Sequence, residues 1–367
     1  MSTSRAIVLT GPNTLELQTF ALPRIGDEDG LVQVELVGVC GSDPGIYAGK
    51  ETRGPRPYPL IMGHEIVGRV VEMGRKARER HGVQPGDRVV VEYAFGCGQC
   101  AACLSGDYTV CEKTYAYGSM ISCQDPPHLF GAYSEYVYIH PNAVMHKIGD
   151  QITPEVGVLI CAVLGNAVRW LRHVGNVSLG DTVVLVGPGQ QGLAAAAVAK
   201  CCGAGRVFLI GLSQDTKRLD LAQEFGADQL IIADQEDARE VLARETGGRM
   251  ADVVMDVTGS PNGAELALTL AGRGGTFVMP GIYKGQKVPL SLDYAVLKEI
   301  SILGVFSHKF KAVRTAISLV QHTQYPFEKM ITHRLPLEEA EKAIKLVAGE
   351  FPEENPIKVV LDPSLRA

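Results

Sequence analysis

Four closely spaced cysteines constrain this chain more than any other feature of its sequence. Cys97, Cys100, Cys103 and Cys111 form a C-x2-C-x2-C-x7-C pattern within residues 96–112. Four thiolates so near in sequence can surround one tetrahedral ion, and zinc suits a closed site made only of sulfur. Because such a site leaves no position open for water, the zinc is predicted to stabilise a lobe and to perform no chemistry.

Disulfides and unrelated buried thiols are the alternative interpretations of these cysteines. Residues 1–17 contain no pattern typical of a secretion signal, so we expect a reducing, cytoplasmic location in which disulfides are rare. The longest uncharged apolar run, between Glu155 and Arg169, is too short to cross a bilayer and predicts a buried helix. A net charge of −6 provides no basic surface for nucleic acid or for an anionic membrane.

Hydrophobic patterning divides the chain into two kinds of structure. Between about residues 5 and 150, short alternating runs such as 31–37 and 66–72 predict antiparallel strands of a β-rich domain. From about residue 153 strands alternate with helices, which is typical of a parallel sheet covered on both faces. Two amphipathic helices and a last strand, near 357–361, are predicted to end the chain.

A glycine-rich turn lies between the first predicted strand and helix of this second part. Gly187, Gly189 and Gly192 form G-x-G-x-x-G, with Gln190 and Gln191 between the last two glycines. The glycines allow a tight turn and the close approach of a pyrophosphate, and the helix N-terminus offers free N–H groups. The pattern predicts a dinucleotide-binding site, whereas the alternative is a loop used only for packing.

The end of the second predicted strand bears on the choice of cofactor. Enzymes that use NAD usually carry an acid there, but the candidate positions are Gly211 and Ser213. Ser213, Lys217 and Arg218 could instead meet a 2′-phosphate, so the sequence favours NADP over NAD. Two alternatives stay open: Asp215 could reach the ribose, and Lys217 and Arg218 equally fit a solvated helix face.

Cys40, His64 and Cys161 are further potential metal ligands, but they lie far apart in the sequence. Their spacing alone therefore leaves open a buried thiol or a core histidine for each. The order of motifs along essentially the whole chain, however, resembles that of zinc-dependent alcohol dehydrogenases of the medium-chain dehydrogenase/reductase superfamily. The motifs are Gly38-Val-Cys-Gly-Ser-Asp, Gly63-His-Glu with Gly68 and Gly74, Pro85-Gly-Asp-Arg-Val, the four cysteines, and Gly187-Pro-Gly-Gln-Gln-Gly.

This resemblance implies an α/β fold with two domains. A GroES-like, β-rich catalytic domain would comprise residues 1–160 and 301–367, with the zinc lobe at 96–112. A Rossmann domain with a doubly wound parallel sheet would comprise residues 161–300. Members of the family are usually dimers or tetramers, so we expect a homodimer or homotetramer.

The resemblance also implies a second, catalytic zinc in each chain. Cys40, His64 and Cys161 would be its ligands. Glu65 resembles the acid that lies behind the zinc, and Asp43 resembles the carboxylate that orients the histidine ligand. A three-ligand zinc leaves one position open for the substrate oxygen.

Three more residues match family positions near the substrate and the cofactor. Ser42 resembles the hydroxyl that passes on the substrate proton. Tyr93 matches a position that lines the substrate pocket in the family, and Lys358 matches a position that contacts a cofactor phosphate. Many members have a histidine two residues after the aspartate as an outer proton relay, whereas this chain has Pro44 and Gly45. This departure leaves the route by which the proton departs open.

The expected function is reversible hydride transfer between a small-molecule alcohol and NAD(P). The aromatic content around the expected pocket favours a secondary or an apolar or aromatic primary alcohol. A polyol (sorbitol-type) or formaldehyde-type dehydrogenase is the alternative, and a non-catalytic member of the family is a more remote one.

Overall fold

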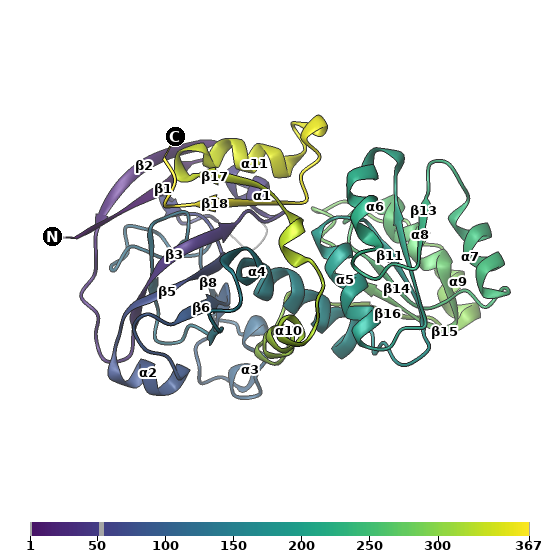
Figure 1. Ribbon diagram of the computed structural model, residues 1–367, viewed down its shortest axis with the longest axis horizontal. Helices are drawn as coiled ribbons and strands as arrows, with labels where there is room; N and C mark the ends of the chain where they lie inside the picture. Colours follow the sequence, from purple (N-terminus) through teal and green to yellow (C-terminus); the bar gives the residue numbers. More distant parts are fainter. Residues whose placement is uncertain (1, 51–54, 367) are drawn as a thin grey trace. The chain divides into compact units, whose positions relative to one another are not determined.

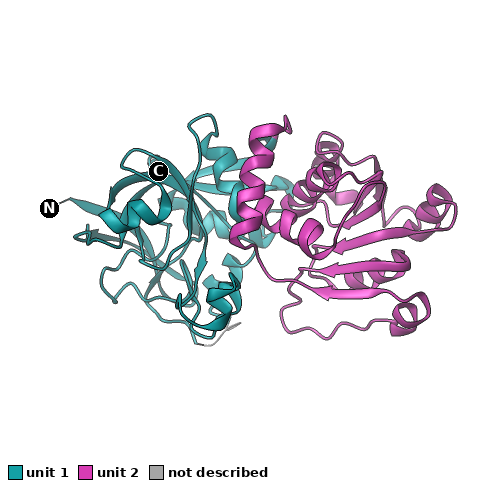
Figure 2. Ribbon diagram, turned by 90° about the horizontal axis from the view of Figure 1, so that it is seen from below, with its two compact units in different colours: residues 1–162, 327–367 teal, residues 163–326 magenta. Residues whose placement is uncertain are grey.

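The computed structural model describes residues 2–50 and 55–366 and divides into two compact units (Figure 2). Unit 1 comprises Met1–Ala162 and Phe327–Ala367, and unit 2 comprises Val163–Pro326. The sequence had placed the second boundary at residue 300. It lies further along the chain because β16 (Ser301–Gly304) pairs with β15 (Ala271–Met279) in the sheet of unit 2.

Unit 1 is built on two β-sheets with mainly antiparallel pairing (Figure 1). The smaller sheet has the strand order β2 (Thr14–Ala21), β1 (Thr3–Gly11), β4 (Leu60–Ile61). The larger sheet has the order β10 (Met145–Lys147), β6 (Arg88–Val91), β5 (Glu65–Met73), β3 (Gly30–Gly38), β18 (Lys358–Asp362), β17 (Ile331–Pro336), and β9 (Tyr136–Ile139) also pairs with β3. The predicted last strand therefore exists and returns the C-terminal segment to β3.

Short helices and a small ribbon complete unit 1. They are α1 (Asp43–Tyr47), α2 (Arg75–His81), α3 (Ala101–Leu104), α4 (Pro154–Leu159), α11 (Ala340–Ala348) and the strand pair β7 (Ala94–Phe95) and β8 (Tyr115–Ala116). β3 and β5 approach each other closely, because a Cβ at Gly68 would lie 2.1 Å from the carbonyl oxygen of Gln33. This close approach accounts physically for a glycine in the middle of a strand.

Unit 2 contains one parallel sheet with the strand order β13 (Gln229–Ile232), β12 (Arg206–Gly211), β11 (Thr182–Val186), β14 (Ala251–Asp256), β15, β16. Numbered from the first strand of the unit, this order is 3-2-1-4-5-6, which is the order of a doubly wound dinucleotide-binding sheet. The strands are mostly buried because helices cover the sheet. The helices are α5 (Gln190–Cys201), α6 (Thr216–Ala222), α7 (Ala238–Thr246), α8 (Pro261–Leu270), α9 (Leu292–Lys298) and α10 (Phe310–His322).

An apolar helix spans Pro154–Val174. As the Thr-Pro-Glu sequence predicts, Thr153 caps its N-terminus, where the side-chain oxygen accepts a hydrogen bond from the N–H of Val156 at 3.4 Å. With 21 residues it is long and apolar enough to cross a membrane, but 72% of its most apolar stretch is buried within the protein. Burial of that kind is typical of a core helix.

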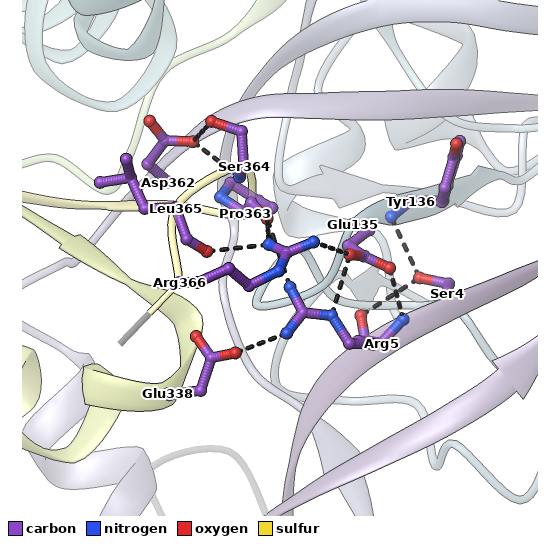
Figure 3. A network of polar contacts seen from close by, with 10 residues as sticks. All are labelled: Ser4, Arg5, Glu135, Tyr136, Glu338, Asp362, Pro363, Ser364, Leu365 and Arg366. Carbon is purple, nitrogen blue, oxygen red and sulfur yellow. Dashed lines mark hydrogen bonds and ion pairs between the residues drawn. The ribbon is translucent and has the colours of Figure 1, made fainter.

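A polar cluster fastens the N-terminal strand β1 to the C-terminal segment (Figure 3). The carboxylate of Glu135 accepts hydrogen bonds from the backbone N–H and the side-chain Nε of Arg5, at 2.8 and 2.9 Å. Arg366 reaches the same carboxylate at 3.3 Å, and Arg5 also pairs with Glu338 at 2.5 Å. Glu135 therefore joins three segments that are distant in sequence.

We expect the substitution Glu135→Ala to lower the free energy of unfolding by about 1–2 kcal/mol, because it removes the side-chain acceptor of a backbone N–H and one acceptor of each of two guanidinium groups. Urea unfolding would measure the change. Glu79→Ala is the matched control: Glu79 makes an exposed pair with Arg75, and its loss should cost under about 0.5 kcal/mol. Equal effects of the two substitutions would contradict this role for Glu135.

Candidate metal centre and dinucleotide site

Strand register brings two of the predicted catalytic zinc ligands together. Gly38, at the end of β3, pairs with Glu65, at the start of β5, so Cys40 and His64 continue from adjacent strand ends. The ligand atoms of Cys40, His64 and Glu65 all lie within 4.8 Å of one another. A thiol, an imidazole and a carboxylate at this separation are a donor set that suits zinc.

Asp43 supports this group from a fully buried position in α1. One carboxylate oxygen lies 3.6 Å from Nδ1 of His64, as expected for a carboxylate that orients a histidine ligand. The other accepts hydrogen bonds from the N–H of Cys40 at 2.8 Å and from the hydroxyl of Tyr133 at 2.9 Å. Burial raises the pKa of Asp43, and burial together with Asp43 raises that of Tyr133 well above its usual value, so Tyr133 is a hydrogen-bond donor.

Glu65 is paired with Lys358 inside the protein. The ammonium group of Lys358 donates to Glu65 and to the carbonyl oxygen of Val39 at 3.2 Å, and both side chains are at most 1% exposed. Burial alone would raise the pKa of Glu65, but Lys358 and His64 outweigh burial and lower it. Since Lys358 is enclosed in this pair, its predicted contact with a cofactor phosphate stays a prediction that would require the pair to open.

Glycine is required at position 38 because of this ion pair. A Cβ there would lie 2.2 Å from a carboxylate oxygen of Glu65 and 2.8 Å from Cε of Lys358. A larger residue would therefore displace both charged side chains. Gly38, the first residue of the Gly-Val-Cys-Gly-Ser-Asp motif, thus leaves room for the Glu65 and Lys358 side chains that pack behind the candidate metal ligands.

Cys161, the predicted third ligand, is buried in the π-helical part of the Pro154–Val174 helix. Among the described residues, its sulfur does not belong to the group that lies within 4.8 Å of Cys40, His64 and Glu65. Burial raises the pKa of its thiol well above the usual value, and the charges of Glu92 and Glu65 add to this effect. Ligation by Cys161 therefore stays a prediction.

Ser42 and Tyr93 both lie beside His64. The hydroxyl oxygen of Ser42 is 3.4 Å from Nε2 of His64, and the residue is exposed at the start of α1. The aromatic ring of Tyr93 is tilted against the imidazole, with ring centroids 5.9 Å apart. The exposed hydroxyl of Ser42 and the aromatic ring of Tyr93 thus both lie next to His64, a candidate metal ligand.

The four predicted structural ligands meet in one group. The sulfur atoms of Cys97, Cys100, Cys103 and Cys111 all lie within 4.8 Å of one another, and none forms a disulfide. The separations between Cys97 and Cys103 and between Cys100 and Cys111 are 4.0 and 3.6 Å. Four thiolates at about 2.3 Å from a tetrahedral zinc would be roughly 3.8 Å apart, so these cysteines fit a zinc ion.

The thiols of the lobe differ electrostatically. Backbone hydrogen bonds from Gln99 and Cys100 lower the pKa of Cys97 to about 6, whereas burial raises the pKa of Cys103 to about 12. Zinc ligation would deprotonate all four thiols. The backbone also follows the cysteines closely, because a Cβ at Gly96 would lie 2.4 Å from the sulfur of Cys103.

A buried polar cluster that the sequence did not reveal connects this lobe to β6 and β10. The carboxylate of Glu92 lies 2.7 Å from Nε2 of His146 and accepts a hydrogen bond from Tyr108. Tyr108 lies between the third and fourth cysteines, and Glu92 directly precedes Tyr93. The only sequence signal was an acid next to the apolar run 89–91.

The glycine-rich turn follows β11 and opens α5, as predicted. Gly187 has a φ of +111°, which favours glycine, and a Cβ at Gly192 would lie 2.0 Å from the carbonyl oxygen of Gly187. A Cβ at Gly189 would meet no atom within 4 Å, so this side of the turn is open. Gln190 and Gln191 begin α5, whose N-terminal N–H groups fit a pyrophosphate.

The end of β12 has polar partners that differ from those predicted. Gly211 is its last residue, and Ser213 donates to Asp234 from its N–H at 2.8 Å and from its hydroxyl at 2.5 Å. Asp215 accepts from the N–H of Leu212 and pairs with Arg218 at 3.2 Å. Lys217 is exposed. Asp234 was missed because it follows the next strand.

We expect Cys103→Ser to remove one of about two zinc ions per chain and to lower the thermal unfolding temperature, because the lobe loses its cross-link. Metal analysis and a thermal melt would measure both effects. Cys201→Ser, at an exposed thiol in α5, is the control and should change neither. Unchanged zinc content in Cys103→Ser would contradict a structural zinc site.

We expect Tyr133→Phe to weaken zinc binding at the Cys40 and His64 site by about 10–100-fold, because Asp43 loses a hydrogen-bond donor that holds it. Chelator competition would measure the affinity. Tyr138→Phe removes a comparable hydrogen bond to Asp29 and should leave zinc affinity unchanged. Equal affinity in wild type and Tyr133→Phe would show that Tyr133 does not position Asp43.

Comparison with known proteins agrees with this geometry. The family model for the alcohol dehydrogenase GroES-like domain matches residues 26–150, and that for zinc-binding dehydrogenases matches residues 192–322. The chain is 39% identical to a probable alcohol dehydrogenase of Mycobacterium tuberculosis, with 98% of each chain covered. It is 31% identical to a sorbitol dehydrogenase of Halalkalibacterium halodurans, with 98% of this chain and 99% of that protein covered.

Solved structures lead to the same family. An alcohol dehydrogenase from Thermotoga maritima superimposes with a TM-score of 0.90 at 30% identity, covering 99% of this chain and 100% of that one. The β-rich unit with its metal-ligand groups and the doubly wound unit with its glycine-rich turn thus have their counterparts in one protein family. The chain belongs to the zinc-dependent alcohol dehydrogenases of the medium-chain dehydrogenase/reductase superfamily.

Proposed function

We propose that this protein transfers hydride between an alcohol and NAD(P), reversibly, with a secondary or an apolar or aromatic primary alcohol as substrate. The observation that carries the proposal is the group of Cys40, His64 and Glu65 with Ser42 at its exposed side. These residues provide metal ligands and a proton-accepting hydroxyl next to one another. The open turn at Gly189 supports a dinucleotide as the hydride carrier.

The residues of the chain supply binding, orientation and proton transfer. Zinc held by Cys40, His64 and Cys161 would lower the pKa of the substrate hydroxyl, and the nicotinamide would accept the hydride. Ser42 accepts the hydroxyl proton and gives its own proton to solvent, to which it is exposed. Carbonyl reduction uses the same proton transfer in reverse.

The residues that hydrogen-bond to the proposed zinc ligands keep the positions of those ligands fixed during turnover. Asp43 holds His64 and is itself held by Tyr133 and by the N–H of Cys40. Proton departure through solvent matches the sequence after Asp43, because Pro44 and Gly45 have no group that could carry a proton. We therefore expect no outer histidine to be required.

The choice of alcohol rests on the surface beside the metal ligands. The Tyr93 ring against His64 favours an apolar or aromatic substituent. A polyol is the second candidate, favoured by the likeness to the sorbitol dehydrogenase. Turnover with aromatic, secondary and polyhydroxy alcohols, assayed side by side, would separate the two.

We further propose a homodimer or homotetramer in the cytoplasm. None of the nine cysteines, all of which lie in the described residues, forms a disulfide, and this supports a reducing compartment. In the described part of the sheet of unit 2, β16 is one of the two edge strands and pairs on one side with β15. An open strand edge of this kind is suited to pairing with another chain.

We expect Cys161→Ala to reduce alcohol oxidation by at least about 100-fold, because a ligand of the catalytic zinc would be lost. Formation of reduced cofactor and zinc content would be measured on the same preparation. Cys202→Ala, at a partly buried thiol outside both cysteine groups, should keep full activity. Full activity of Cys161→Ala would exclude Cys161 as the third ligand.

A further inference from the structure

The carboxylate of Asp234, which lies just beyond the end of the neighbouring strand β13, is placed at the end of β12. Gly211 and Ile232 are the last residues of β12 and β13 and pair with each other in the parallel sheet. Ser213 and Asp234 each follow two residues later, so equal steps from a shared register bring them together. The Asp234 carboxylate accepts both hydrogen-bonding groups of Ser213, at 2.8 and 2.5 Å.

This position corresponds to the adenosine end of a dinucleotide. In the doubly wound sheet of unit 2, β11 is the first strand and β12 the second, and an acid after the second strand usually binds the ribose hydroxyls. Gly211 cannot carry a side chain here, because a Cβ would lie 2.8 Å from Cγ of Pro188 in the glycine-rich turn. The polar side chains that follow Gly211 at this position are therefore that of Ser213 and that of Asp234, to which Ser213 is hydrogen-bonded.

The surrounding charges disfavour a phosphate. Arg218 is paired with Asp215, and Asp215 also accepts the N–H of Leu212, which ties both side chains to their own turn. The hydrogen bonds from Ser213 lower the pKa of Asp234, so its carboxylate is ionised at neutral pH. A 2′-phosphate would therefore meet a negative charge, and it would have to compete with that charge for the donors of Ser213.

We propose that Asp234 selects NAD over NADP by accepting a hydrogen bond from the adenosine ribose and repelling a 2′-phosphate. The inference rests on the proposed function, in which the chain uses a nicotinamide dinucleotide. It reverses the preference for NADP that Ser213, Lys217 and Arg218 suggested in the sequence. In this chain the acid is Asp234, which lies 21 residues after Ser213 and follows β13, whereas the acid usually lies at the end of the second strand, here β12.

The test measures binding, without turnover. Dissociation constants for NADH and NADPH would be obtained by fluorescence titration of the purified full-length protein and of Asp234→Asn. Wild type should bind NADH at least about tenfold more tightly than NADPH, and Asp234→Asn should reduce that ratio about tenfold by gaining affinity for NADPH. Asp220→Asn, which removes an exposed charge of α6, should keep the wild-type ratio. Circular dichroism would verify that each variant is folded.

The outcomes separate this inference from the proposed function. A wild-type preference for NADPH, or an unchanged ratio in Asp234→Asn, would overturn the role of Asp234 and leave the alcohol dehydrogenase function intact. Binding of neither dinucleotide would overturn both. The expected ratios without oxidation of any alcohol would support Asp234 and overturn the proposed reaction.

Discussion

The pairing of β3 with β5 is the constraint on which the catalytic part of the molecule depends. It sets Gly38 opposite Glu65 and thereby places Cys40 and His64, the residues just outside these strand positions, at one site. The pairing also leaves room for the Lys358 side chain, which enters from β18 to meet Glu65. The candidate metal centre is thus formed at three strands whose order in the sheet is β5, β3, β18.

The buried charged side chains behind the candidate metal ligands are stable in the interior only because each has a partner of opposite charge or a hydrogen-bond donor. Asp43, Glu65 and Lys358 are at most 1% exposed, and an isolated buried charge would cost several kcal/mol. Lys358 compensates Glu65, whereas Tyr133 and the N–H of Cys40 compensate Asp43. Removing one partner would leave the other charge buried without compensation, typically at a cost of about 3–5 kcal/mol. The network therefore holds the ligands rigidly, and a zinc ion would bind to a prepared site.

Local patterns in the sequence were sufficient for the features formed by residues near one another. The four cysteines span fifteen residues and meet as predicted, and the glycine-rich turn forms between β11 and α5. Tyr133, by contrast, is 90 residues from Asp43, and Lys358 is 293 residues from Glu65. No spacing rule links such residues, because their contact depends on which strands become neighbours. The membership of residues 301–304 in unit 2 depends in the same way on strand pairing, because β16 pairs with β15.

Both units place their functional groups just beyond the ends of paired strands. In unit 1 the antiparallel register of β3 and β5 sets Gly38 opposite Glu65, and Cys40 and His64 meet just beyond this pair. In unit 2 the parallel register of β12 and β13 aligns Ser213 with Asp234. A shift of either register by one residue would move these side chains by about 3.3 Å and turn them to the opposite face of the sheet. Strand pairing, more than the identity of residues around the sites, therefore determines whether metal ligands and cofactor-selecting groups meet. Substitutions that disturb either register should therefore affect both the stability of the sheet and the geometry of the site.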